Sequence, residues 1–178
     1  MSTTLTRMPE SPEGQAFWEG NWRSVAAGHE EQVRYFVVCP EDAAPSPAQL
    51  AFSARIGAVF SSCQDAARAF VASAVCAAPQ QYGLDEAAAA AFRSRVLDSR
   101  EGTELAPLGG AEATFYGSDE WFLRFTESPF PACSVLGVGI DFVGERPVSA
   151  RCLDGDAAME PALPASAGDL DSEREEGR

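Results

Sequence analysis

Two short stretches in the second half of the chain, EWFLRFTE at residues 120–127 and VLGVGIDFVG at residues 135–144, decide the fold. In both, large apolar residues recur at every second position, which is typical of a strand with one buried face. The first stretch places Trp121, Leu123 and Phe125 on one face, and the second does the same with Val138 and Ile140. Because a short loop joins the stretches, we expect an antiparallel pair in which these five side chains share a buried face.

The connecting segment SPFPACS, residues 128–134, supports two interpretations. Its prolines would hold Cys133 or Ser134 in place as a nucleophile, with His29, the single histidine, as the base. Alternatively, Cys133 is a packing thiol where the next strand begins. We favour packing, because the separation of Cys133 from His29 in sequence permits contact without indicating it.

Strand patterns continue on both sides of this pair. EATFYG at residues 112–117 precedes it, and ERPVSARC at residues 145–152 follows after a turn at Gly144 and Glu145. The second half of the chain therefore predicts an antiparallel meander.

The middle of the chain predicts helices. Ser46 and Pro47 form a helix start, and an apolar stripe at helical spacing follows. This stripe consists of Phe52, Ile56, Val59 and Phe60. We expect an interruption at SSCQD, residues 61–65, which resembles a capping box. A second helix should follow it, and a third should run from about residue 85 to residue 99.

Two further patterns complete the domain. Trp18 and Trp22 lie four residues apart, as on one face of a helix. QVRYFVVC at residues 32–39 is rich in β-branched and aromatic residues and predicts a strand that joins the sheet. The fold class is therefore α+β, with a helical N-terminal half packed on an antiparallel sheet formed mainly by the C-terminal half. We expect a disordered lead over residues 1–15, a single domain over residues 16–153 and a disordered acidic tail over residues 154–178.

The charge of the chain bears on its partners. The formal net charge is −14, and the 13 basic residues are all arginine and are scattered along the chain. Phosphate binding relies on clustered basic residues, so nucleic acid is not an expected partner. An acidic surface either attracts a basic protein or only keeps the chain soluble. With no signal-like N-terminus, no membrane-spanning stretch and five scattered cysteines, we expect a cytoplasmic protein with reduced thiols that does not associate with a membrane.

Candidate site residues are few. With one histidine and no paired-cysteine spacing, no metal site is expected. The G-x-G at Gly137 and Gly139 lies inside a strand pattern, so no phosphate-binding loop and no cofactor are expected either. The acids Asp119, Glu120 and Asp141 could instead contribute to a binding surface. The aromatic residues Trp121 and Phe122 complete this candidate set.

Residues 33–152 resemble bacterial domains that accompany polymorphic toxins and are taken as immunity proteins. The shared pieces are a strand followed by Pro47 and Gln49 at the helix start, and a late glycine step at Gly137, Val138, Gly139 and Ile140. The resemblance implies a binding protein that inhibits a partner toxin, and it brings no catalytic residues with it. Where that family often carries an acidic or histidine-containing element before the glycine step, this chain has PFPACSVL.

Two hypotheses of function follow. The first is a non-catalytic acidic binding protein, of which an immunity-type inhibitor of a toxin is one form. The second is a small enzyme or accessory protein of bacterial specialised metabolism, with a pocket between helices and sheet. Six aromatic residues are candidates to line such a pocket: Trp18, Trp22, Phe115, Tyr116, Trp121 and Phe122.

Overall fold

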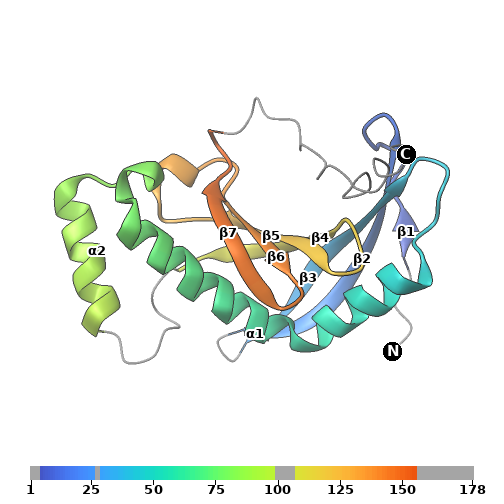
Figure 1. The fold of residues 1–178 in the computed structure, drawn as a ribbon, viewed down its shortest axis with the longest axis horizontal. Helices are drawn as coiled ribbons and strands as arrows, with labels where there is room; N and C mark the ends of the chain where they lie inside the picture. The colour runs from blue at the N-terminus through green and yellow to red at the C-terminus, as the bar shows by residue number, and fades with distance from the viewer. Residues whose placement is uncertain (1–4, 27–28, 99–106, 156–178) are drawn as a thin grey trace, which may run out of the picture.

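A computed structural model describes residues 5–26, 29–98 and 107–155. Its central feature is one seven-stranded sheet with the strand order β1-β2-β3-β4-β5-β6-β7. The strands are β1 (Thr6–Arg7), β2 (Gln15–Ala26), β3 (His29–Pro40), β4 (Gly109–Phe115), β5 (Glu120–Glu127), β6 (Val138–Val143) and β7 (Arg146–Cys152). The helices α1 (Pro47–Ala77) and α2 (Glu86–Asp98) and the short 3-10 turns η1 (Pro79–Tyr82) and η3 (Pro131–Cys133) complete the fold (Figure 1).

The sheet is mixed, because one of its strand pairs is parallel. β3 and β4 run in the same direction, with Arg34 opposite Glu112, whereas all other neighbouring strands are antiparallel. A parallel pair cannot be joined by a tight turn and needs a crossover. Here α1 and α2 lie in the connection between β3 and β4.

This topology corrects the expected fold class. The N-terminal half is not helical throughout and does not pack as a unit on a C-terminal sheet, because three strands precede α1 and belong to the same sheet as the four that follow it. The strand expected at residues 32–39 does join the sheet, as β3. The meander expected from the second half is present as β4 to β7, with the turn at Gly144 and Glu145.

The largest local difference concerns Trp18 and Trp22, which lie on β2 and not on a helix. Residues four apart share a face of a helix and equally share a face of a strand, so the spacing alone did not distinguish the two. Ala16, Gly20, Trp22 and Ser24 are buried, and Trp18 on the same face is partly buried, so burial follows the two-residue period of a strand. β2 also pairs with β3 along its whole length.

Helix α1 is continuous for 31 residues and does not break at SSCQD. Its start is as predicted, with Ser46 as the cap and Pro47 in the first turn. Gln49 additionally forms a reciprocal capping box with Ser46. The expected interruption is absent because the apolar stripe runs on through Cys63 and Ala67, both of which are buried. Within the described part of the chain, neither helix combines the length and the apolar character needed to cross a bilayer.

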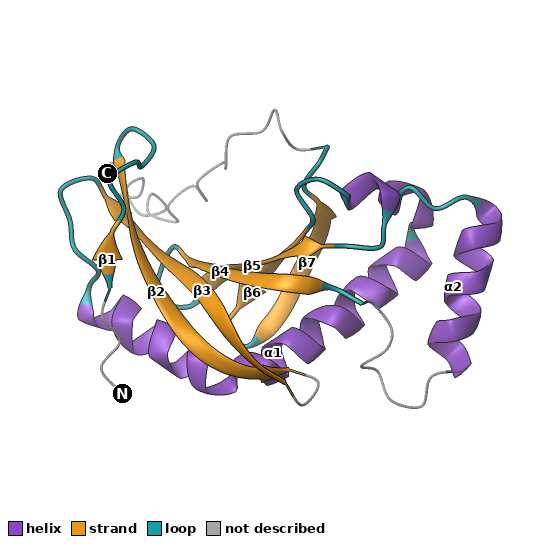
Figure 2. Ribbon diagram, turned by 180° about the vertical axis from the view of Figure 1, so that it is seen from behind, coloured by secondary structure: helices purple, strands orange, loops and turns teal. Residues whose placement is uncertain are grey.

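The core lies between α1 and one face of the sheet, the face on which α1 lies in both ribbon views (Figures 1 and 2). Stacked and edge-to-face rings fill it, among them Trp22 on Tyr35 and Trp121 on Phe142, with ring centroids 4.2 and 4.3 Å apart. The expected buried face is confirmed: Leu123 lies opposite Ile140 and Phe125 opposite Val138.

The two ends of the chain differ in what the structure describes. Residues 1–15 were expected to be a disordered lead, but Thr6–Arg7 pairs with β2, with Arg7 opposite Trp18. Residues 1–4 lie outside the described residues. Most of the expected acidic tail, residues 156–178, also lies outside them.

Candidate functional site on the open face of the sheet

No described helix covers the sheet face opposite α1, which we call the open face (Figure 2). Because side chains alternate along a strand, each residue between two core positions belongs to this face. The strand register then aligns these residues across the sheet in rows.

Two such rows cross five strands from β3 to β7. The arginine row consists of Arg34, Glu112, Arg124, Gly139 and Arg151, each opposite the next in the register. The aromatic row consists of Phe36, Thr114, Phe122, Asp141 and Ser149, aligned in the same way. The open face therefore combines guanidinium groups with half-buried rings over a continuous surface.

Phe122 is at the centre of the contacts between the two rows. A Cβ on Gly139 would lie 2.6 Å from Cε2 of Phe122, so the ring lies directly on the glycine backbone. The guanidinium of Arg151 stacks above the same ring, 5.3 Å from its centroid. Arg151 also pairs with Asp141, whose carboxylate accepts a hydrogen bond from the Ser149 hydroxyl. These contacts hold Phe122 and Arg151 in fixed relative positions, as a preorganised surface requires.

The arginine row is held by ion pairs around Glu112. Its carboxylate pairs with Arg34 and, at 3.7 Å, with Arg124. The hydrogen bond to Glu112 raises the pKa of Arg34. Arg124 also donates from Nε to the carbonyl of Leu136 at 2.8 Å, which connects the row to the loop before β6. Such partly exposed pairs contribute little stability and mainly fix orientation.

Tyr116, directly after β4, borders the aromatic row and is half-exposed. Desolvation and the nearby Asp141 raise the pKa of the Tyr116 phenol, whereas Arg151 lowers it, and the net effect is a raised pKa. The phenol therefore stays protonated at neutral pH and can donate a hydrogen bond to a partner.

Of the five residues predicted to bind, the structure brings two together on the open face. Phe122 and Asp141 lie opposite each other in the aromatic row. Trp121 is only 2% exposed and donates from Nε1 to the Gly144 carbonyl, so it belongs to the core. Asp119, in the turn before β5, and Glu120, the first residue of β5, are both exposed at the end of the sheet.

The proposed nucleophile and base are not a reactive pair in this structure. Cys133 is buried and forms a disulfide with Cys152, so it has no thiolate to attack with. This corrects the expectation that all five thiols are reduced. His29 is the first residue of β3, and its side chain lies outside what the structure describes.

The expected pocket between helices and sheet is occupied by side chains. Trp22, Phe115 and Trp121 lie in the core there, and Trp18 is half-buried, donating to the Ala43 carbonyl at 3.3 Å. Tyr116 and Phe122 lie outside the core.

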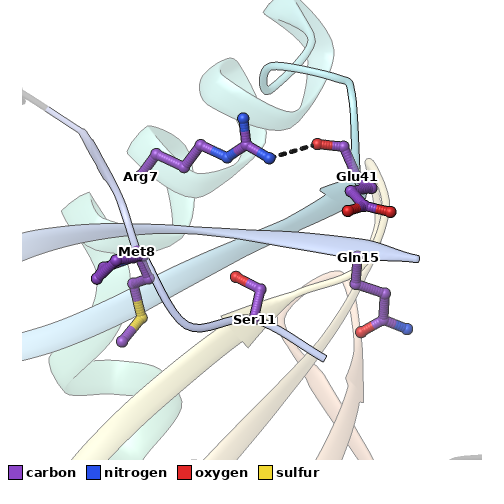
Figure 3. A pocket seen from close by; sticks show the side chains of 6 residues that line it. Arg7, Met8, Ser11, Gln15 and Glu41 are labelled. Carbon is purple, nitrogen blue, oxygen red and sulfur yellow. Dashed lines mark hydrogen bonds between the residues drawn. The ribbon is translucent and has the colours of Figure 1, made fainter. Parts of the chain in front are cut away.

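A pocket of about 330 Å³ lies elsewhere, beside the N-terminal segment (Figure 3). Its lining residues are Arg7, Met8, Pro9, Ser11, Gln15 and Glu41. Arg7 donates to the Glu41 carbonyl at 2.7 Å, and Ser11 Oγ accepts from the Phe17 N–H. These groups fasten the N-terminal segment to the sheet. Among the described residues no group of three potential metal ligands occurs.

Sequence reasoning missed the arginine row. The alternation of β5 did place Arg124 on the face opposite the core, but Arg34 and Glu112 are 78 residues apart in sequence and align only because β3 pairs with β4. The parallel crossover that brings them together leaves no local pattern.

Comparison with known proteins gives no relative: no family model matches the chain, and no curated protein or solved structure matches it significantly.

Proposed function

We propose that this chain is a non-catalytic protein-binding module whose partner contacts the open face. The specific form that the sequence resemblance implies is an immunity-type inhibitor of a toxin. The observation that supports the proposal is the pair of rows on the open face, with Phe122 held between Gly139 and Arg151. Aromatic and arginine side chains in fixed positions are the residues that contribute most to protein interfaces.

The open face and the rest of the protein surface differ in charge, and we assign them different roles in binding. The two rows carry three arginines against two acids, so the acidic excess of the chain lies elsewhere. We expect the acidic residues outside the open face to attract a basic partner by long-range electrostatics and to speed its association. The open face itself then provides the close contacts, with its arginines directed at carboxylates or backbone carbonyls of the partner.

The test compares charge reversal on and off the open face. The Arg151→Glu variant removes the stack on Phe122, and the Arg55→Glu control makes the same change in charge at an exposed position of α1. Each variant is used to capture proteins from a lysate of the source organism, and any protein retained by the wild type is identified, purified and titrated by calorimetry. We expect Arg151→Glu to weaken binding at least tenfold and Arg55→Glu to leave it within about twofold, since truncating a central anchor typically costs over 1 kcal/mol.

A toxin among the captured proteins would be tested by co-expression. The wild-type chain should restore growth of cells that produce the toxin, and the Arg151→Glu variant should not. Equal loss of binding in both variants would show that net charge alone matters and that the open face is not the contact surface.

A further inference from the structure

A covalent bond fastens the end of β7 to the loop before β6. Cys152, the last residue of β7, is disulfide-bonded to Cys133, and their Cα atoms are 4.9 Å apart. The next residue, Leu153, donates its N–H to the Gly137 carbonyl at 3.0 Å. We call residues 152–154 the strap.

Asp154 adds a second attachment to the same loop. Its carboxylate accepts hydrogen bonds from the backbone N–H groups of Val135, at 2.8 Å, and of Leu136. These bonds hold the loop tip in a position where the Val135 side chain is 77% exposed. Asp154 therefore couples the strap to these two amides of the exposed loop.

The strap also borders the open face. A Cβ on Gly139 would lie 2.8 Å from Cδ2 of Leu153 and 2.6 Å from Cε2 of Phe122, so both side chains press on the same glycine. Arg151, which stacks on Phe122, directly precedes Cys152. Breaking the disulfide at Cys152 therefore frees the residue next to Arg151, whose contact with Phe122 is at the centre of the site.

We propose that the Cys133–Cys152 disulfide is a redox-controlled lock that holds the strap, and through it the Phe122–Arg151 contact, in place. Its effect on a partner rests on the proposed function, because the open face is where that partner would bind. Oxidation fixes the strap and the face. Reduction by two equivalents of a low-molecular-weight thiol, RSH, which leave joined as RSSR while both protein sulfurs become thiols, releases both.

The oxidation requires a disulfide as co-reactant, and we name a low-molecular-weight disulfide, RSSR. The thiolate of Cys152, which is half-buried, attacks one sulfur of RSSR, so that the external S–S bond breaks, a mixed disulfide forms and one RS⁻ leaves. The Cys133 thiolate then attacks the Cys152 sulfur and expels the second RS⁻. The two protein thiols lose their protons to the two RS⁻ ions, so two protein sulfurs are oxidised and two external sulfurs are reduced.

Two of the other cysteines are poorly suited to this exchange. Burial raises the pKa of the Cys63 thiol to about 11, and burial also raises the pKa of Cys39. A thiol with a raised pKa carries little thiolate at neutral pH and reacts slowly. Cys76 is free and half-buried in α1, which makes it a matched control.

The test is amide hydrogen exchange on the full chain, incubated with either glutathione disulfide or excess reductant. We expect the amides of Val135 and Leu136 to exchange at least tenfold faster after reduction. The Gly144 amide, which is bonded to the Asp119 carbonyl at the other end of β6, should not change. Cys152→Ala should behave as reduced protein under both conditions, and Cys76→Ala should respond as the wild type does. Asp154→Ala should speed exchange at Val135 and Leu136 while the disulfide still forms.

Two results would overturn the lock. One is that intact-mass analysis finds no loss of two hydrogens after treatment with glutathione disulfide. The other is that the loop amides exchange equally fast in both redox states. A partner obtained by the capture experiment should bind the oxidised form at least tenfold more tightly, and equal dissociation constants would overturn the regulatory role alone. Failure to capture any partner counts against the proposed function, and the exchange result still decides whether the lock exists.

Discussion

The indole of Trp22 lies against the backbone of Gly57: a Cβ on that glycine would be 2.8 Å from Nε1 and 2.9 Å from Cε2 of the ring. Trp22 is on β2 and Gly57 is on α1, so this contact sets how closely the long helix approaches the N-terminal side of the sheet. A glycine inside a helix normally costs about 1 kcal/mol relative to alanine. Here its absent side chain makes room for the tryptophan.

Gly57→Ala should therefore destabilise the protein despite its better helix propensity. We expect a loss of about 1–3 kcal/mol, the usual range for inserting a methyl group into a packed site. Urea melts of the variant and the wild type measure it. Ser73→Ala, at an exposed position of α1, is the control and should be neutral or slightly stabilising. A more stable Gly57→Ala protein would mean that the helix can move away from Trp22 at no cost.

The two faces of β5 should respond differently to truncation. Leu123 is fully buried between Ala113 and Ile140, so Leu123→Ala should cost about 2–5 kcal/mol. Arg124, one residue on, faces solvent and pairs with Glu112, so Arg124→Ala should cost about 1 kcal/mol or less. Comparing the two variants in urea tests the register, and equal small losses would contradict it.

Loss of the disulfide should cost stability only under oxidising conditions. The bond closes a loop between residues separated by 19 in sequence, for which chain-entropy arguments give about 3 kcal/mol. Cys152→Ala should be less stable than the oxidised wild type by about this amount and should match the wild type in excess reductant. Cys133→Ser should behave similarly, with a further loss from placing a hydroxyl in a buried site.

Stability should depend on pH through Asp154. Desolvation acts to raise the pKa of this carboxyl, but the hydrogen bonds from the backbone N–H groups of Val135 and Leu136 and their neighbours outweigh it, so the pKa is lowered. A lowered folded pKa gives stability that is fully present above the unfolded value of about 3.9 and is lost as the pH falls through the folded pKa. The difference in urea midpoint between wild type and Asp154→Ala should therefore shrink on acidification below about pH 4. A difference that stays constant to pH 2 would contradict the carboxylate role.

The acidic tail should be dispensable for folding, as its composition predicts. Residues 156–178 lie outside the described residues and contain few large apolar side chains. Ending the chain at Gly155 should leave the thermal midpoint nearly unchanged. Ending it at Leu153 should lower the midpoint, because that truncation also removes the Asp154 carboxylate. A loss of several degrees in the first truncation would show that the tail contributes contacts of its own.

The sequence predicted the elements whose pattern is local and unambiguous. The alternation in β5 and β6 was sufficient to predict the buried face that Leu123 and Ile140 share, and Ser46 with Pro47 was sufficient to predict the start of α1. β2 was misassigned because its tryptophans are spaced for either element. The prediction of a break in α1 was wrong. Polar residues between two apolar stretches occur both at helix ends and on the exposed side of a continuous helix, so the pattern did not distinguish the two.

The site was predicted only in part, for a physical reason. Phe122 and Asp141 were both named as candidate binding residues, and the structure places them opposite each other on β5 and β6. The arginine row and the Cys133–Cys152 bond both depend on which segments the fold brings together. For the bond, five cysteines allow many pairings, and the sequence does not choose among them. Interactions of this kind follow from the tertiary arrangement and not from sequence spacing.

The parallel contact between β3 and β4 also bears on the order in which the chain folds. Every other strand pairing can form from segments close in sequence, but Arg34 meets Glu112 only after a closure of 78 residues. Closing so long a loop costs entropy before any contact offsets it. The β2–β3 hairpin and the β4–β7 meander should therefore become structured as two separate units, and their joining across α1 should be the slow step that limits the folding rate.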